Sequence, residues 1–178
     1  MKKRLLPILL IACFPITEAR ESAVTESLVK FTVRNAGISV NGTLSGIRCE
    51  ISFDPENLGA SNIYGTADPS TISTGIGIRD RHLRNSDYFD VIKFPEIRMR
   101  SKNFVKVSQD TFSAKFDLTI KNITKEVTVV FSRTFRQNEM HYKASFEIDR
   151  LDFDLGGKSF LLDERVHVSM LMKEALSR

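Results

Sequence analysis

Asp80, His82 and a nearby serine, either Ser73 or Ser86, are the residue types of a hydrolytic triad of nucleophile, base and orienting acid. Asp80 and His82 are two positions apart, and residues with that spacing on a helix point to different sides of it. The sequence also contains no G-x-S-x-G nucleophile turn. We therefore expect no enzyme here. Instead, Arg79, Asp80 and His82 are interpreted as a hydrogen-bonded structural cluster that anchors an irregular segment to one end of the fold.

Metal and cofactor chemistry find equally little support. The three histidines, His82, His141 and His167, are scattered singly, without an H-x-x-x-H, H-E-x-x-H or C-x-x-C pair. Gly75-Ile76-Gly77 lacks the third glycine and the lysine of a phosphate-binding loop. Cys49 is a lone cysteine in an alternating segment, which is typical of a small buried hydrophobe. The sequence predicts no metal site and no cofactor.

The elements that must position these residues are mostly β-strands. Apolar residues alternate with polar ones in seven segments, which is the pattern of half-buried antiparallel strands. The alternating sets are Val29-Phe31-Val33, Ile47-Cys49-Ile51-Phe53, Ile97-Met99, Phe112-Ala114-Phe116-Leu118, Val127-Val129-Phe131, Tyr142-Ala144-Phe146-Ile148 and Val166-Val168-Met170-Met172. Turn residues separate them at Asn41-Gly42, Asp54-Pro55-Glu56-Asn57, Lys121-Asn122, Gln137-Asn138-Glu139 and Gly156-Gly157. Six to eight short strands indicate an all-β sandwich or barrel, and closure into a barrel is favoured because it removes exposed sheet edges.

Helical candidates occur only between Ile78 and Asp90. Gly75 and Gly77 loosen the chain before this segment, and Ser86 is suited to cap a second short turn. The distinctive polar residues therefore lie in the one expected helical segment.

Three blocks of the sequence carry a resemblance to a known family. They are ISTGIGIRDRHLRNSDYFDVIKFP from Ile72, LTIKNITKEV from Leu118 and DRLDFDLGGKSFLLDERVHV from Asp149. Together they resemble the YceI-like family, over roughly Lys30 to Met172, and the R-D-x-H-L pattern that begins at Arg79 is the most specific part. The chain departs from the family pattern at Asn122, where glycine is usual, and asparagine tolerates a positive φ better than most residues.

The resemblance implies a lipocalin-like antiparallel barrel of about eight strands that binds a long apolar lipid in its lumen. A polyisoprenoid, either an isoprenoid quinone or a polyprenyl phosphate, is the implied ligand class, with a fatty acid or fatty amide as alternatives. From the residues alone, a barrel filled by side chains is favoured, with a structural or stress-related role in the cell envelope as the alternative function, and only the resemblance favours an open lumen. The periodicity nominates as lumen lining Phe31, Phe53, Ile97, Met99, Phe116, Leu118, Phe131, Phe146, Ile148 and Met170.

The N-terminus reads as a secretory signal, which implies a periplasmic or secreted protein. Lys2, Lys3 and Arg4 precede a short apolar stretch, and Ala19 ends a small-residue cleavage pattern. We expect a signal peptide over residues 1–19 and one barrel domain over 20–178, without a transmembrane span in the mature chain. A lipobox-like sequence ending at Cys13 leaves a lipid-anchored form as the alternative.

Charge excludes one further class of partner. Residues 1–19 hold three basic residues and one acidic residue, so 23 basic and 21 acidic residues remain after their removal. These charges are interleaved along the chain, which is typical of a solvated outer face and not of a surface that follows phosphates. We expect no nucleic-acid binding. The oligomeric state stays open, a homodimer included.

Overall fold

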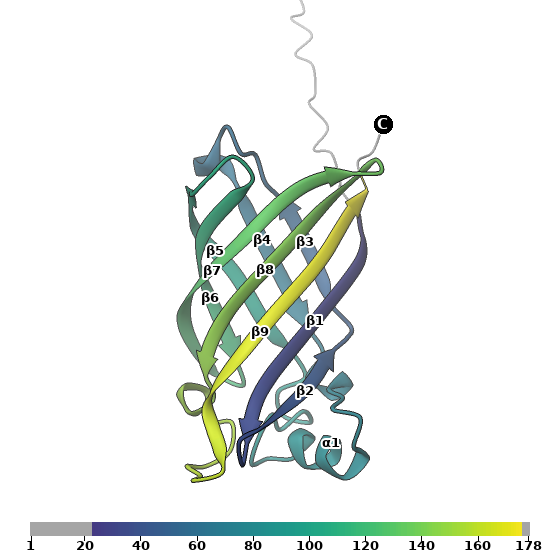
Figure 1. The fold of residues 1–178 in the computed structure, drawn as a ribbon, viewed down its shortest axis with the longest axis vertical. Coiled ribbons are helices and arrows are strands. Elements are labelled where there is room, and N and C mark those ends of the chain that lie inside the picture. Colours follow the sequence, from purple (N-terminus) through teal and green to yellow (C-terminus); the bar gives the residue numbers. More distant parts are fainter. Residues whose placement is uncertain (1–22, 176–178) are drawn as a thin grey trace, which may run out of the picture.

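The computed structural model describes residues 23–175, so the expected signal peptide lies outside the described residues. Nine strands and one α-helix follow one another, and Figure 1 shows the strands as a tilted, elongated barrel. The bounds are β1 (Ala23–Asn35), β2 (Ile38–Leu44), β3 (Arg48–Ser52), β4 (Asn62–Ala67), α1 (Gly77–Arg84), β5 (Ile97–Lys106), β6 (Thr111–Ile120), β7 (Ile123–Arg136), β8 (Glu139–Asp149) and β9 (Leu162–Ala175). Short 3-10 turns are η1 (Leu58–Ala60), η2 (Pro69–Thr71) and η3 (Arg150–Phe153). This agrees with the all-β barrel and short helix that the sequence predicts, with nine strands against about eight.

The nine strands form one antiparallel sheet in the order β2-β1-β9-β8-β7-β6-β5-β4-β3. Curling brings one face of every strand to the inside, so residues two apart share the interior. β6 shows this most clearly, because its alternate apolar side chains from Phe112 to Ile120 are all buried. The period-two pattern of the sequence is thus the inside-outside pattern of the barrel wall.

The expected closure of the barrel is incomplete. β2 and β3 are the two edges of the sheet, and no backbone ladder joins them in the part of the chain described. The outer edge of β2 is instead covered by the segment before α1, where Thr43 and Ser73 exchange two backbone hydrogen bonds of 2.8 and 3.1 Å. We call the line where β1 and β2 face β3 the seam.

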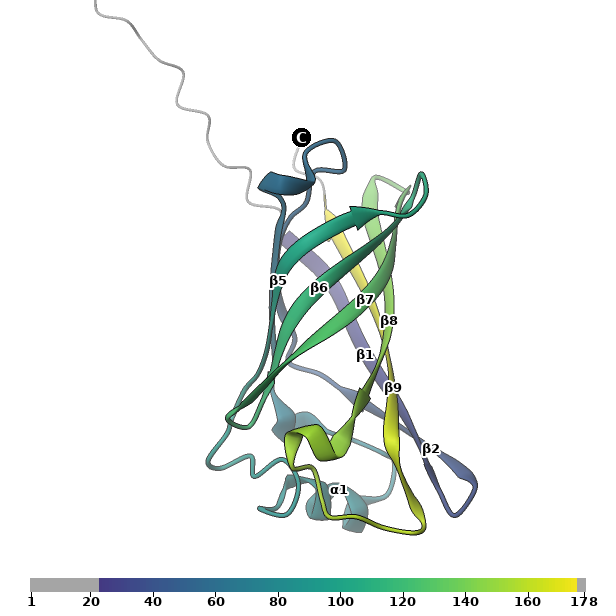
Figure 2. The same ribbon diagram turned by 90° about the vertical axis from the view of Figure 1, so that its left-hand side faces the viewer.

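The two ends of the barrel differ. The end that we call the α1 end carries α1, η3 and the β1–β2 and β6–β7 hairpins, and the opposite, far end carries the β5–β6 and β7–β8 hairpins. Figure 2 shows α1 beneath the barrel, with the yellow-green turn of η3 beside it. A backbone hydrogen bond of 2.8 Å from Gly156 N to Asp87 O joins the segment after η3 to the segment after α1.

Of the five turn predictions, four were right and one was wrong. The β7–β8 connection at Gln137 and Asn138 has two positive φ angles, as a two-residue hairpin requires. Lys121-Asn122 also forms the β6–β7 turn, although the positive φ falls on Lys121. Asn41-Gly42 is not a turn but lies inside β2, and the chain turns earlier, at Ala36-Gly37. The ring of Phe31 covers Gly42 so closely that an added Cβ atom would lie 2.1 Å from the ring.

Candidate functional site

The interior of the α1 half of the barrel is hollow. A cavity of about 320 Å³, which we call the main cavity, is lined by β1, β2, β4, β5, β6, β8, β9 and the segments around α1 and η3. Most of its wall is apolar. Its apolar lining includes Val29, Phe31, Val33, Val40, Leu44, Ile47, Ile72, Leu83, Tyr88, Phe89, Ile97, Leu118, Ile120, Phe146, Ile148, Leu155, Leu162, Val166 and Val168.

A second, smaller cavity of about 60 Å³ lies toward the far end. Gly65, Met99, Met170 and Met172 line both cavities, so they form the neck between them. Methionine side chains are unbranched and flexible, and they adapt to partners of irregular shape. The three methionines, which we call the methionine neck, are therefore the movable boundary between the two spaces.

Beyond the smaller cavity the barrel is packed with aromatic rings. Phe53 lies edge-on against Phe104, Phe112 and Phe131, with ring centroids 5.3, 4.9 and 5.3 Å away. Phe112 and Phe131 stack at 5.6 Å. Edge-to-face contacts of this kind add to the gain from burial. These four rings form an aromatic plug, so the filled interior that the residues alone allowed is present in one half of the barrel.

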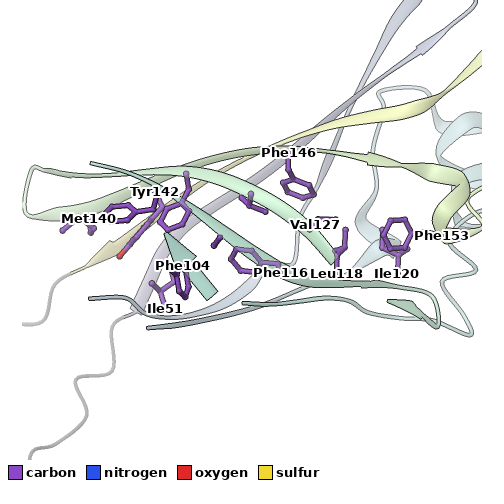
Figure 3. Close-up of a cluster of buried hydrophobic side chains, with 14 of the residues drawn as sticks. Ile51, Phe104, Phe116, Leu118, Ile120, Val127, Met140, Tyr142, Phe146 and Phe153 are labelled. Atoms are coloured by element: carbon purple, nitrogen blue, oxygen red, sulfur yellow. The ribbon is translucent and has the colours of Figure 1, made fainter. Parts of the chain in front are cut away.

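The structure brings nine of the ten nominated lining residues to the two cavities. The main cavity takes Phe31, Ile97, Met99, Leu118, Phe146, Ile148 and Met170, and the small cavity takes Phe116 and Phe131 with the same two methionines. Phe53 lines neither cavity and belongs to the aromatic plug. Figure 3 shows the buried side chains following the barrel from Met140 and Tyr142 near the far end to Phe153 near the α1 end.

Polar residues of the main cavity gather at the α1 end. Arg79 and Asp80 both bind Thr74, which the sequence argument did not single out. The Asp80 carboxylate accepts hydrogen bonds from the backbone N–H of Thr74, at 2.8 Å, and from its hydroxyl. The Arg79 guanidinium donates to the Thr74 hydroxyl at 2.7 Å and to its carbonyl at 3.0 Å. The hydroxyl bond from Thr74, assisted by the charges of Arg84 and Arg79, holds the pKa of Asp80 below its usual value.

This arrangement ties α1 to the segment that covers β2. Arg84 adds a bond of 2.8 Å to the carbonyl of Ile72, which is itself fully buried. His82 stands apart from the hydrogen bonds and packs edge-on against the Tyr88 ring at 5.0 Å. The nominated cluster therefore contains Arg79 and Asp80 around Thr74, with His82 at the rim of the main cavity.

Arg150 is a buried polar residue of the cavity wall that the sequence did not predict. Arg150 is only 3% exposed. Its guanidinium donates to the carbonyls of Leu155 at 2.9 Å, Asp163 at 3.0 Å and Leu162 at 3.3 Å. Through these three hydrogen bonds Arg150 holds the η3 segment and the start of β9 together. No signal in the sequence distinguishes this arginine, because its three acceptors come from a loop that only the fold brings around it.

A second polar pair is buried at the far end. The hydroxyl of Tyr142 donates to the Glu174 carboxylate at 2.8 Å, and the Arg133 side chain approaches the same hydroxyl at 3.4 Å. Burial raises the pKa of Tyr142 above its ordinary value. Burial, with smaller contributions from Glu174 and Glu50, also raises the pKa of the Cys49 thiol to about 12. Cys49 thus stays protonated at neutral pH, and a thiol is a far weaker nucleophile than a thiolate.

Two further observations concern the described part of the chain. Within residues 23–175, no group of three His, Cys, Asp or Glu side chains is placed to hold a metal ion. In the same range, the structure contains no helix of the length and hydrophobicity that crossing a membrane requires.

Comparison with known proteins identifies relatives in sequence and in fold. The family model of the YceI-like domain matches residues 21–173. A UPF0312 protein of Vibrio cholerae is 27% identical over 137 residues, which are 72% of each chain. A UPF0312 protein of Yersinia pestis is 28% identical over 124 residues, 68% of this chain and 64% of that protein.

Solved structures show the same fold at lower identity. BcnA of Burkholderia cenocepacia superimposes with a TM-score of 0.78 at 17% identity, over 83% of this chain and 95% of BcnA. A polyisoprenoid-binding domain from Saccharophagus degradans gives a TM-score of 0.71 at 12% identity, over 89% of this chain and 99% of that domain. Because the family model spans nearly all described residues, the chain belongs to the YceI-like family.

Proposed function

We propose that this protein is a non-catalytic binding protein that holds one long apolar lipid inside its barrel. The observation that carries the proposal is the pair of apolar cavities joined at the methionine neck. Removing methylene groups from water stabilises such a complex by about 0.8 kcal/mol for each buried CH₂. The wall offers little else, because its polar residues are confined to the α1 end.

The proposed ligand is a polyisoprenoid, such as an isoprenoid quinone or a polyprenyl phosphate, with a fatty acid or amide as the second candidate. Support comes from the family and from the Saccharophagus degradans neighbour, which is described as a polyisoprenoid-binding domain. The shape of the interior also favours an extended molecule, since the main cavity narrows at the neck and continues toward the aromatic plug. A fully filled, purely structural barrel fits the far half of the interior but not the α1 half.

Export to the periplasm or beyond is part of the proposal and rests on the N-terminal sequence. Mass spectrometry of protein purified from the cell envelope should give an N-terminus at Arg20. A diacylglyceryl group on Cys13 would favour the lipid-anchored alternative, and unprocessed protein would refute export.

The ligand is tested by organic extraction of the natively expressed protein followed by mass spectrometry, which should yield about one lipid for each chain. Met99→Trp should shift the extracted lipids toward shorter chains, because a larger side chain narrows the neck. Val130→Trp is the matched control, since Val130 is 47% exposed on the outer face of β7. A wild-type extract without lipid, together with strong destabilisation by Met99→Trp, would mean a filled core and no lipid binding.

A further inference from the structure

Exposed apolar side chains are concentrated on the outer surface of the α1 end. Ten large hydrophobic residues are exposed among those that the structure describes, and six of them lie at this end. Isolated exposed hydrophobic residues are normal on a protein, whereas several on one face mark an interaction site. Ile92 and Phe160 are the most exposed, at 95% and 110%. The six residues, which we call the apolar tips, are Ile38, Ile76, Ile78, Ile92, Phe160 and Leu161.

Hydrogen bonds hold the loops that carry the apolar tips. A backbone bond of 2.7 Å from Ala36 N to Leu161 O ties the β1–β2 hairpin, which carries Ile38, to the loop before β9. The Ser159 hydroxyl accepts a bond of 3.1 Å from the N–H of Leu161, which closes a tight turn around Phe160. Figure 2 shows the β1–β2 hairpin, the loop before β9 and α1 at the same end of the barrel. These tips therefore project from fixed loops of one face.

The tips around α1 are held in a similar way. Ile76 and Ile78 lie at the start of α1, which is tied to the segment that covers β2. In the turn after α1, the carbonyl of Asp90 accepts a backbone bond of 3.0 Å from Lys93. Ile92 lies inside this closed turn and is almost fully exposed. Its side chain therefore points into solvent although the backbone on both sides is fixed.

The exposed charges beside the apolar tips are basic. The stretches of chain that carry the tips are 34–39, 75–82, 91–93 and 157–161. Their exposed Arg and Lys residues are Arg34, Arg81, Lys93 and Lys158. Their one acidic residue, Asp80, is buried and bound to Thr74. Exposed acidic residues of the same end lie in other stretches, and they are Asp87, Asp149, Asp152, Asp154, Asp163 and Glu164. The surface at the tips is therefore both apolar and positively charged.

This combination suits an anionic lipid bilayer better than a rigid protein partner. A protein interface has a close-packed apolar core, whereas the apolar tips come from separate stretches with basic residues beside them. At a bilayer surface, apolar side chains reach the acyl chains while Lys and Arg extend to the headgroups, and anionic lipids attract each such charge. Asn35 and His82 are exposed and also line the main cavity. The face with the tips thus belongs to the hollow half of the barrel and not to the half with the aromatic plug.

We propose that the α1 end is a docking surface for an anionic lipid bilayer. The apolar tips enter the boundary between headgroups and acyl chains, and the neighbouring arginines and lysines contact the anionic headgroups. This inference goes beyond the proposed function, because docking uses the outer surface and requires no lipid in the lumen. Docking in this orientation places the hollow half of the barrel against the membrane.

Vesicle sedimentation measures the docking. Delipidated mature protein that begins at Arg20 is mixed with vesicles of phosphatidylethanolamine and phosphatidylglycerol, or with vesicles of phosphatidylcholine. We expect tighter binding to the anionic vesicles, with a difference that shrinks at high salt. Ile92→Ser combined with Phe160→Ser should weaken binding to both kinds of vesicle by about tenfold or more, because both side chains lose apolar area. Val107→Ser combined with Phe135→Ser is the matched control, since both residues are exposed at the far end.

Charge reversal tests the basic residues. Lys93→Glu combined with Lys158→Glu should weaken binding to the anionic vesicles by about tenfold and leave binding to phosphatidylcholine near wild type. Lys106→Glu combined with Arg136→Glu reverses the same number of charges at the far end and should have little effect.

A fluorescent reporter identifies the face that touches the bilayer. The chain contains no tryptophan, so one introduced indole reports its own surroundings. The emission of Phe160→Trp should shift to the blue when anionic vesicles are added, and brominated lipids should quench it. Phe135→Trp, at the far end, should show neither change. These readouts remain informative if a serine variant loses stability.

The outcomes separate this inference from the proposed function. A wild-type protein that binds neither kind of vesicle at low salt would overturn the docking surface and leave the extracted lipid unexplained by it but unaffected. Unchanged binding in Ile92→Ser with Phe160→Ser, or an equal loss in the far-end control, would also overturn it. A dimer that the same serine variant dissociates, without a blue shift of Phe160→Trp on vesicles, would make a second copy the occupant and reject the bilayer. Vesicle binding by a protein whose native extract holds no lipid would sustain the docking surface and refute the proposed function.

Discussion

Gly42→Ala separates a hollow lumen from a filled one with a single methyl group. The new Cβ atom would lie 2.1 Å from the Cζ atom of Phe31, and two further ring atoms would be at 2.6 and 2.8 Å. Ordinary carbon contacts are about 3.5 Å, so the ring has to retreat by about 1.4 Å. Gly42 does not have a positive φ, and alanine is therefore compatible with its backbone. All of the strain falls on Phe31.

The energetic result depends on what lies behind the Phe31 ring. Phe31 lines the main cavity, so the ring can move into open space. Overpacking a filled core costs typically 1–3 kcal/mol, whereas replacing glycine by alanine at a compatible position stabilises by about 0.4–1 kcal/mol through the unfolded chain. With a hollow lumen the ring moves at a small part of that overpacking cost, and the gain from alanine offsets most of it. We therefore expect the free energy of unfolding to change by less than about 1 kcal/mol.

Urea unfolding of delipidated protein measures this change, and extraction of natively expressed protein measures the lipid content. The displaced ring occupies part of the lumen, so Gly42→Ala should carry less lipid or shorter chains at nearly unchanged stability. Gly65→Ala is the stability control, because its Cβ atom would meet its nearest neighbour at 3.7 Å. A loss of several kcal/mol in Gly42→Ala with unaltered lipid content would refute the reasoning.

Four further predictions concern the polar groups. Because the pKa of Asp80 is lowered, its contribution to stability is present above the unfolded pKa of about 3.9 and is lost as pH falls through the lower folded value. In Asp80→Asn, the free energy of unfolding in urea should therefore fall less steeply at acid pH. The same steepness as in wild type would contradict this. Thr74→Val should destabilise by about 1–3 kcal/mol in thermal unfolding, because a partly buried carboxylate and guanidinium lose a shared partner. Tyr142→Phe leaves Glu174 without its hydroxyl donor and should cost about 1–3 kcal/mol in the same assay, with no loss if water replaces the hydroxyl. Cys49, with its pKa of about 12, should react with iodoacetamide at pH 8 far more slowly in native protein than in urea, and equal rates would contradict its burial.

The fold was largely predictable because the barrel wall imposes a period of two on the chain. Six of the seven alternating sets fall wholly on strands, and the set from Ile47 to Phe53 extends one residue beyond each end of β3. The sets identify the inward face correctly for Phe31, Phe116 and Phe146. The two strands that escaped prediction, β2 and β4, contain Gly42 and Gly65, which interrupt the alternation. An Asn-Gly pair is a strong hairpin signal, but in β2 packing beneath Phe31 overrides it.

The site was less predictable because periodicity gives the direction of a side chain but not its depth along the barrel. Phe53 points inward like Phe31, yet it meets other phenylalanines where Phe31 meets empty space. Thr74 and Arg150 were missed for a different reason. Their partners lie only five to thirteen residues further along the chain, but they meet through the path of irregular loops, which no periodic pattern encodes.

The seam between the edges of the sheet has a mechanical consequence. In a sealed barrel, strand number and shear together set the radius, so a wider bore requires a different ladder. Here the wall is a curled sheet whose edge strands, β2 and β3, share no backbone ladder. Its circumference can therefore change when one edge strand slides past the other. Such sliding breaks side-chain contacts and the two backbone bonds between Thr43 and Ser73, and it leaves the backbone ladders between neighbouring strands in place. A change of bore therefore costs the contacts at the seam, the two Thr43–Ser73 bonds included, and none of the nine-strand ladder.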